Sequence, residues 1–320
     1  MCLTEIIVSM RGGRQMPFVK IDEKNIYYEE YGKHNKNTIV YFHGGPGESC
    51  LSYTHQAKVL GENYHVISFD QYGVLRSDAI PENQVFGVKD HAQLIEKMRK
   101  KLGINSWTVL GHSYGGMLAS HYVHTYSKHV DSVIYDCPTW NIALTSKTVA
   151  SFLLPYFEKV GCEKGVNICN DILNEEITSK DAFDKAIMLS RMMQEDEGIR
   201  IYSHVIDPHD YQQYNMKYIP QINTDATNWG KFVVHTQKLM EQGDFYKNYL
   251  PNLKDIKVPS LLLVGKYDLT CGKDQQDYFC KYSHNGYIVE FQNSAHLSWI
   301  QEPQAYTKAI IDFLDGELSS

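Results

Sequence analysis

The chain has 320 residues, of which 43% are hydrophobic, so it is long enough to bury a sizeable core in one large domain or two smaller ones. Its 31 basic residues against 38 acidic ones give a formal charge of −7, which argues against a nucleic-acid or anionic-membrane partner. The 7 cysteines are scattered without zinc-site spacing or disulfide-scaffold density, and the chain has neither a signal-peptide pattern nor an apolar run of membrane-spanning length. We therefore expect a cytoplasmic protein with reduced thiols, no membrane partner and no nucleic-acid partner.

The first part of the chain alternates short apolar strands with amphipathic helices. Residues 18–32 predict a hairpin of two strands. Further strands are predicted within 37–44, 64–71, 106–113 and 131–138, and helices within 51–60, 89–102 and 115–126. Alternation of this kind builds a mainly parallel sheet that is covered by helices on both faces.

The pattern changes after the sixth strand. Residues 139–251 are helix-like, rich in Met, Tyr and charge, and contain no clean strand. Strands return within 258–268 and 286–293, a helix is predicted between them near 272–282, and a last helix spans 302–315. We therefore predict an α/β fold with one core domain in two pieces, 1–138 and 252–320. A mostly helical cap domain, 139–251, is inserted after the sixth strand.

The segment "GHSYG", residues 111–115, lies where a predicted strand meets a predicted helix. It fits the pattern G-x-S-x-G, in which glycines permit a tight turn that exposes the central serine as a nucleophile. A serine hydroxyl also needs a base and an acid to become reactive. In this context we predict Ser113 to be a catalytic nucleophile rather than part of a simple connecting turn.

Candidates for the acid and the base follow the two late strands. Asp268 is the last residue of the segment 258–268 and follows its apolar strand. His296 comes after the strand in 286–293. Functional groups of an open α/β sheet gather at the carboxyl ends of its strands, so we expect these two side chains to meet Ser113. Asp136, at the end of its own strand, is an alternative acid that we rank below Asp268.

Other histidines are weaker candidates. His43 and His112 border the glycine loop and the nucleophile, and we interpret both as supporting or packing residues. His121 and His124 are three residues apart on one helix, but no third ligand is evident, so we predict no metal site and no cofactor.

The stretch "HGGPGES", residues 43–49, follows the third strand and has three conceivable roles: a phosphate cradle, a structural turn, or a source of backbone N–H groups for a reacting oxygen. A phosphate-binding loop requires a G-K-[ST] ending, which is absent here.

Five segments together make the sequence resemble the α/β-hydrolase superfamily and, within it, the proline iminopeptidase family of serine aminopeptidases. They are "HGGPG" at 43–47, "DQYGVLRSD" at 70–78, "GHSYGG" at 111–116, "GKYDLT" at 265–270 and "SAHLSWIQEP" at 294–303. The chain order of serine, acid and histidine is also the order of α/β hydrolases. The resemblance covers residues 18–138 and 252–316, whereas the cap shows no matching motif.

The resemblance implies that the glycine loop lies beside the nucleophile and that the backbone N–H groups of Gly45 and Tyr114 form an oxyanion hole. It implies acyl-enzyme catalysis that releases an N-terminal residue, such as proline, from a small peptide. The alternative is an esterase, thioesterase or amidase acting on a small acyl substrate. A third reading is a binding protein of the same fold without catalysis, which the complete set of catalytic residue types disfavours.

Family members that cleave an N-terminal residue have acids in the cap that bind the free amino group, one of them shortly after "W-G". Here "NWGKFVVH", residues 228–235, contains no carboxylate at that place. The substrate-binding residues that we predict are Gly44, Glu195, Glu197 and Trp229. A solvated helix face for the two glutamates, and a place in the core for most cap aromatics, remain the simpler interpretations.

Overall fold

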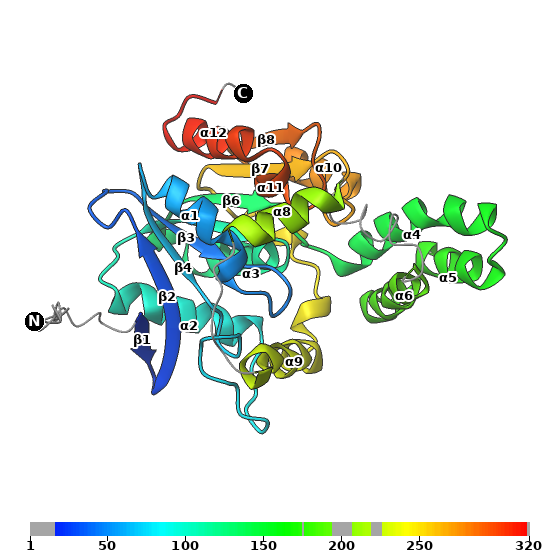
Figure 1. The fold of residues 1–320 in the computed structure, drawn as a ribbon, viewed down its shortest axis with the longest axis horizontal. Coiled ribbons are helices and arrows are strands. Elements are labelled where there is room, and N and C mark those ends of the chain that lie inside the picture. The colour runs from blue at the N-terminus through cyan, green and yellow to red at the C-terminus, as the bar shows by residue number, and fades with distance from the viewer. Residues whose placement is uncertain (1–16, 175, 194–206, 219–225, 319–320) are drawn as a thin grey trace, which may run out of the picture.

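The computed structural model describes residues 17–174, 176–193, 207–218 and 226–318. Its centre is an eight-stranded sheet with the order β1-β2-β4-β3-β5-β6-β7-β8 (Figure 1). The strands are β1 (Phe18–Ile21), β2 (Lys24–Tyr31), β3 (Thr38–Phe42), β4 (His65–Phe69), β5 (Trp107–His112), β6 (Val130–Asp136), β7 (Ser260–Gly265) and β8 (Gly286–Phe291).

Strand directions agree with the sequence prediction. The strands β1 and β2 form an antiparallel hairpin, and β2 is antiparallel to β4. All other neighbouring strands are parallel. Every residue of β3, β4, β5 and β7 is buried, which explains why these strands read as continuous apolar runs instead of alternating ones.

Helices cover both faces of the sheet, as predicted. One hydrophobic cluster joins the sheet to α2 (Val88–Lys101), α3 (Tyr114–Tyr126) and α10 (Lys273–Tyr282). A second cluster, on the other face, joins it to α1 (Thr54–Leu60), α11 (Ser298–Gln301) and α12 (Pro303–Leu314). Short 3₁₀ turns complete the connections: η1 (Cys50–Tyr53), η2 (Ser127–His129), η4 (Asp244–Tyr246) and η5 (Leu250–Lys254).

The described residues between β6 and β7 are helical apart from turns. They form α4 (Ile142–Lys159), α5 (Glu163–Leu173), α6 (Ser179–Met192), α8 (Pro208–Tyr218) and α9 (Ala226–Glu241). Helices α4, α5 and α6 share a hydrophobic cluster of their own and stand beside the sheet domain (Figure 1). Within the described ranges, no helix is both long and apolar enough to cross a membrane.

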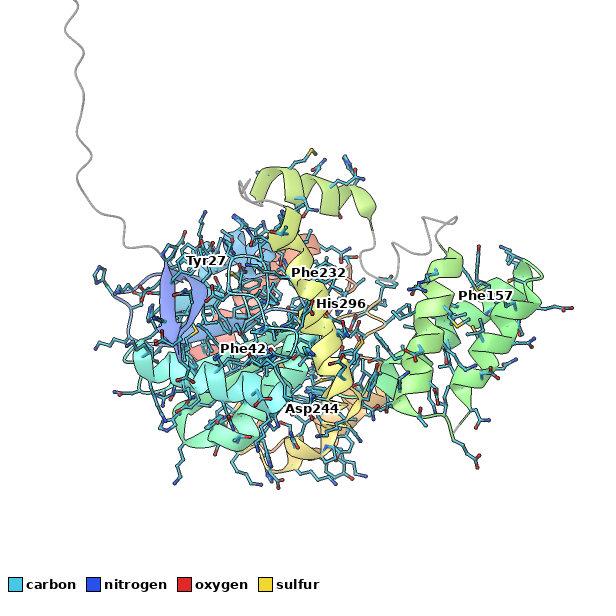
Figure 2. All side chains as sticks on the ribbon, turned by 90° about the horizontal axis from the view of Figure 1, so that it is seen from below. Tyr27, Phe42, Phe157, Phe232, Asp244 and His296 are labelled. Carbon is cyan, nitrogen blue, oxygen red and sulfur yellow. The ribbon has the colours of Figure 1, made fainter. Side chains whose placement is uncertain are left out.

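Helices α8 and α9 pack against the sheet domain. Tyr214 of α8 is buried among core residues, and its hydroxyl donates a hydrogen bond to the carbonyl of Ser52 (3.3 Å). In α9, His235 and Leu239 are buried against the core. Figure 2 shows α9, which carries Phe232, running across the sheet domain while the α4–α6 group with Phe157 stands apart.

Candidate active site

Three strands end at the same edge of the sheet and carry the three residues that the sequence singled out. Ser113 directly follows β5, Asp268 follows β7, and His296 follows β8. All three are buried. Since β5, β6, β7 and β8 are parallel neighbours, their carboxyl ends gather these side chains from distant parts of the sequence.

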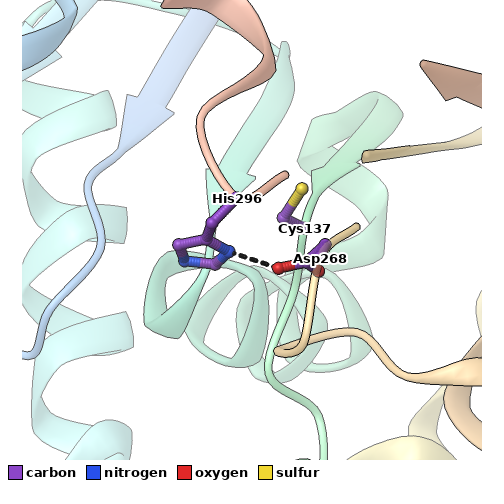
Figure 3. Close-up of side chains that lie close together, drawn as sticks. All are labelled: Cys137, Asp268 and His296. Atoms are coloured by element: carbon purple, nitrogen blue, oxygen red, sulfur yellow. Dashed lines mark hydrogen bonds and ion pairs between the residues drawn. The ribbon is translucent and has the colours of Figure 1, made fainter. Parts of the chain in front are cut away.

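His296 and Asp268 form a hydrogen-bonded pair. The His296 Nδ1 atom lies 2.8 Å from Asp268 Oδ1 (Figure 3). Asp268 also accepts hydrogen bonds from the backbone N–H groups of Thr270 (3.1 Å) and Cys271 (2.8 Å). These contacts hold the carboxylate in place, so that it can orient the imidazole ring.

The pKa values of the pair follow from this arrangement. Burial alone would raise the pKa of Asp268, but the positive charge of His296, its hydrogen bond and the two backbone N–H groups lower it overall. Burial alone would lower the pKa of His296, whereas the negative charges of Asp268, Asp136 and Glu48 raise it above its ordinary value. The two groups therefore stabilise each other in their charged forms.

Ser113 occupies a strained turn between β5 and α3. Its backbone angles are φ 54° and ψ −119°, outside the regions that L residues normally adopt. Two hydrogen bonds hold this conformation. The Ser113 N–H donates to the Asp136 carbonyl (2.9 Å), and the Ser113 carbonyl accepts from the Thr139 N–H (3.0 Å). This is the sharp strand-to-helix turn that the pattern G-x-S-x-G predicts.

The neighbouring His112 connects this turn to the base. Its ring centroid lies 4.6 Å from that of His296. Its Nδ1 atom lies 3.2 Å from Asp136 Oδ2, and the same carboxylate oxygen accepts a hydrogen bond from the Tyr306 hydroxyl (3.1 Å). Asp136 thus pairs with His112, while His296 pairs with Asp268, in agreement with the ranking of the two acids.

Cys137 lies close to the pair of Asp268 and His296. Its sulfur and the ligand atoms of Asp268 and His296 all lie within 4.8 Å of one another. Burial, followed by the charges of Asp268 and Asp136, raises the pKa of the Cys137 thiol well above its usual range. Without a bound cation, the thiol is therefore protonated.

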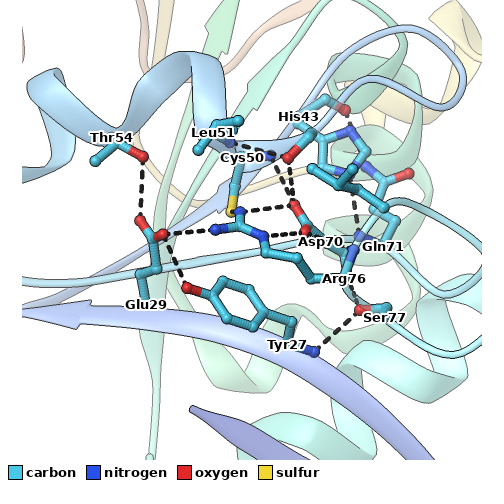
Figure 4. Close-up of polar contacts among 12 residues, drawn as sticks. Tyr27, Glu29, His43, Cys50, Leu51, Thr54, Asp70, Gln71, Arg76 and Ser77 are labelled. Atoms are coloured by element: carbon cyan, nitrogen blue, oxygen red, sulfur yellow. Dashed lines mark hydrogen bonds and ion pairs between the residues drawn. The ribbon is translucent and has the colours of Figure 1, made fainter. Parts of the chain in front are cut away.

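The loop "HGGPGES" is tied down at both ends by the segment that follows β4. At its start, His43 Nε2 accepts a hydrogen bond from the Gln71 N–H (3.0 Å), and the His43 carbonyl accepts one from the Gln71 side chain (2.9 Å). At its end, the Ser49 hydroxyl donates to Asp70 Oδ1 (2.5 Å). Figure 4 shows these contacts.

A buried ion pair holds the anchoring segment itself. The Arg76 guanidinium donates to Asp70 Oδ2 (2.6 Å) and to Glu29 Oε1 (2.9 Å), and it lies over the ring of Tyr27. Burial opposes the charge on Asp70, but Arg76 outweighs that effect and lowers the pKa of the carboxyl. The residues of the segment "DQYGVLRSD" therefore have a structural role, because they fix the position of the glycine loop.

Two backbone N–H groups next to Ser113 are available to a ligand. Gly45 adopts φ 111°, a conformation that L side chains rarely adopt, and Tyr114 is the first residue of α3, where N–H groups have no partner within the helix. Within the part of the chain that the structure describes, neither N–H group donates a hydrogen bond to an acceptor. The predicted oxyanion donors are thus both unoccupied by other described residues.

Comparisons with known proteins agree with this geometry. A family model described as the α/β hydrolase fold matches residues 37–158. The chain is 26% identical to a proline iminopeptidase of Heyndrickxia coagulans over 98% of this chain and 99% of that protein. It is 27% identical to a proline iminopeptidase of Saccharolobus solfataricus over 91% and 89% of the two chains.

Solved structures share its fold. A proline iminopeptidase-related protein from Thermus thermophilus superimposes with a TM-score of 0.67 at 19% identity, over 93% of this chain and 96% of that one. A serine hydrolase from Cycloclasticus zankles superimposes with a TM-score of 0.65 at 16% identity, over 95% and 98%. The chain has the α/β-hydrolase fold, and its sequence is similar to those of proteins named proline iminopeptidase.

Helix α9 packs directly against the glycine loop. The hydroxyl of Thr236 donates a hydrogen bond to the Pro46 carbonyl (3.1 Å). Phe232 lies so close to Gly47 that a Cβ atom on this glycine would come within 2.6 Å of the Phe232 Cβ. Gly47 also adopts φ 89°, so the loop and the helix both depend on glycine at this position.

Lys231, in the stretch "NWGKFVVH", has a different role from the family's acid. Its ammonium group donates hydrogen bonds to the carbonyls of Leu75 (3.1 Å) and Ser77 (2.9 Å). It thereby ties α9 to the same segment that anchors the glycine loop.

A groove of about 550 Å³ lies between α6 and α9. Its lining includes Phe232 and Thr236, two residues of α9 that contact the glycine loop. Another groove, of about 590 Å³, lies between α1, α8 and α12 and is lined by residues outside the predicted site.

The predicted substrate-binding residues have different outcomes. Gly44 lies beside Ser113, as expected. Trp229 lies near the start of α9 and is 49% exposed, and the α6–α9 groove is lined by other residues. Glu195 and Glu197 lie outside the described residues. A role in substrate binding stays a prediction for all four residues.

Sequence reasoning missed Glu48, which the structure places at the site. A Cβ atom built on Gly44 would lie 2.9 Å from Glu48 Oε2 and 3.1 Å from Ser113 Cβ, so the carboxylate and the serine flank the same point. The available signal was an acidic residue within the glycine stretch itself. None of the three roles conceived for that stretch used its carboxylate.

Proposed function

We propose that this α/β hydrolase is a serine hydrolase that releases the N-terminal residue of small peptides through an acyl-enzyme intermediate. The observation that carries the proposal is the hydrogen-bonded pair of His296 and Asp268 beside the strained turn of Ser113. Relatives named proline iminopeptidase support the choice of substrate.

In the proposed mechanism, the Ser113 oxygen attacks the carbonyl carbon of the first residue while His296 takes the hydroxyl proton. The N–H groups of Gly45 and Tyr114 stabilise the resulting oxyanion; loss of one such donor typically costs on the order of 10² to 10³ in turnover. His296 then gives its proton to the leaving amine as the C–N bond breaks. Water hydrolyses the acyl-enzyme by the same steps, again with His296 as base.

We also propose that residues 139–251 act as a cap over a core formed by 1–138 and 252–320. The contacts of α9 with the glycine loop support this division, because they put part of the cap directly against the oxyanion donors. The α6–α9 groove is then a route by which a small peptide reaches Ser113.

A second candidate function is hydrolysis of a small ester, thioester or amide without a free amino group. The observation that favours it is Lys231, which binds loop carbonyls from the stretch where the resemblance to proline iminopeptidases led us to expect an acid.

The test compares aminoacyl anilides with acyl esters, using the natural chain and Ser113→Ala. We expect turnover of prolyl or other aminoacyl anilides, labelling of the natural protein by a fluorophosphonate probe, and loss of both in Ser113→Ala. Turnover of esters together with inactivity on every free-amine substrate would establish the second candidate. If the natural protein is not labelled and has no activity, both enzymatic candidates are wrong.

A further inference from the structure

We infer that the Glu48 carboxylate binds the ammonium group of the substrate and so selects substrates with a free amino group next to the reacting carbonyl. The inference rests on the proposed function, and it assigns the amino-group subsite to the glycine loop of the core.

The position of Glu48 is fixed by the loop rather than by its own side chain. Its N–H donates a hydrogen bond to the Gly44 carbonyl (3.3 Å), which closes a turn over residues 44–48. The next residue, Ser49, is held by Asp70. The backbone that carries Glu48 is therefore anchored on both sides, and its carboxylate points back toward Gly44 and Ser113.

The carboxylate is not used by the rest of the described structure. Among residues 17–174, 176–193, 207–218 and 226–318, no side chain or backbone N–H forms a hydrogen bond or ion pair with it. It is partly buried, in contrast to the exposed glutamates that form surface ion pairs, such as Glu23. A partly buried carboxylate without a partner is a good binding site for a cation that arrives with the substrate.

The distances suit an amino group on the acyl side of the scissile bond. In a peptide, the N-terminal nitrogen is separated from the attacked carbonyl carbon by two bonds, about 2.5 Å. A charge-assisted N⁺–H···O⁻ bond adds about 2.8 Å. The position that a Cβ atom would take on Gly44 lies 2.9 Å from Glu48 Oε2 and 3.1 Å from Ser113 Cβ. A substrate whose carbonyl carbon is at Ser113 therefore has its amino group within reach of this Glu48 oxygen.

The charge of the substrate's amino group also fits such a subsite. An α-amino group has a pKa of about 8, so it is mainly cationic at neutral pH. Glu48 also adds to the negative charge near His296, although Asp268 contributes more to the raised pKa of that histidine. A cation bound to Glu48 offsets this charge and favours the neutral His296 that must accept the serine proton.

The test uses two boronic acids that differ only in the amino group: pyrrolidine-2-boronic acid and its carbocyclic counterpart, cyclopentylboronic acid. In each, the Ser113 oxygen forms a bond to boron while His296 takes the hydroxyl proton, so both report on the same adduct. Inhibition is measured against hydrolysis of p-nitrophenyl acetate, which does not depend on peptidase activity.

With the natural chain we expect the cationic boronic acid to bind more tightly. Glu48→Gln is expected to weaken its binding roughly 10- to 100-fold and to leave cyclopentylboronic acid within about 3-fold. Glu48→Asp, which keeps the charge, should retain more of the preference than Glu48→Gln. Glu62→Gln is the matched control, because Glu62 is an exposed residue outside the site, and it should change neither constant.

Equal weakening of both inhibitors by Glu48→Gln, or an unchanged preference, would overturn the inference while leaving the serine hydrolase intact. If the preference follows Glu48 but no aminoacyl anilide is cleaved, the inference stands and the peptidase function fails. Absence of inhibition by either compound, together with absence of fluorophosphonate labelling, would overturn both.

Discussion

The edge of the sheet and the helical segment between β6 and β7 are built in different ways. At the sheet edge, buried charges and hydrogen bonds fix almost every group near Ser113, including the glycine loop that Asp70 and Gln71 hold. The α4–α6 group is instead held by its own apolar cluster. Only part of the helical segment, mainly α9, contacts the glycine loop through described residues. The comparison teaches that polar contacts organise the sheet edge around Ser113, whereas apolar packing organises the α4–α6 group.

Two buried histidines show the same contrast electrostatically. His296 lies beside Asp268, whose charge outweighs burial and raises the pKa of the ring. His235 of α9 is buried too, and its pKa is lowered to about 4, because burial outweighs its hydrogen bond to the Tyr72 carbonyl. One histidine is therefore arranged to accept a proton, and the other to stay neutral.

The largest expected effect concerns the sheet edge. Asp268→Asn should reduce kcat by about 10⁴-fold, because an amide no longer stabilises the imidazolium and favours the wrong tautomer of His296. Steady-state kinetics on an aminoacyl anilide or an ester measures this loss. Asp274→Asn, at an exposed position of α10, is the control and should keep full activity. Retention of more than a tenth of kcat by Asp268→Asn would show that His296 does not depend on this acid.

The next effect concerns acid stability of the contact between α9 and the core. The unfolded chain protonates His235 near pH 6.5, but the folded protein does so only near pH 4, so stabilisation is complete above pH 6.5 and is lost as the pH falls toward 4. The loss is on the order of 3 kcal/mol in the free energy of unfolding. His296, with its raised pKa, contributes in the opposite direction, since its stabilisation is present at low pH and is lost as the pH rises.

Urea unfolding at pH 7 and pH 5 measures this dependence. His235→Asn offers a non-titrating side chain that can still donate to the Tyr72 carbonyl, and it should flatten the dependence. An identical pH dependence in the natural chain and in His235→Asn would exclude His235 as its source.

The smallest effect concerns the contact between the two regions. Gly47→Ala should lower the free energy of unfolding by about 1 to 3 kcal/mol more than Gly103→Ala does, because both glycines have positive φ but only Gly47 faces another side chain, that of Phe232. It should also reduce kcat several-fold, since displacement of the loop moves the oxyanion donors. Denaturant unfolding and steady-state kinetics test both parts. Equal behaviour of the two variants would mean that α9 does not constrain the loop.

Much of the core could be predicted from the sequence. Strand and helix periodicity predicted the hairpin, the mainly parallel sheet and its covering helices, because each of these elements has a local pattern. The candidate residues Ser113, Asp268 and His296 were also accessible, since turn chemistry and strand ends mark them along the chain.

Other features could not be predicted. No sequence pattern around Glu48 distinguishes it from a solvent-exposed glutamate. Its place beside Ser113 depends on a turn that directs its carboxylate toward Gly44. Lys231 likewise has no pattern that reveals its carbonyl partners. Between β6 and β7, amphipathic helices indicate that one face of each helix is buried, but not which residues cover it.

The sequence by itself therefore determined the sheet, its helices and the chemical types that meet at the strand ends, because these depend on short-range periodicity and on turn geometry. Only the tertiary structure decided which acid pairs with His296, how α9 holds the glycine loop, and where Glu48 points. These outcomes depend on distances between side chains that are far apart in the chain or that share one folded loop, and such distances exist only once the chain has packed.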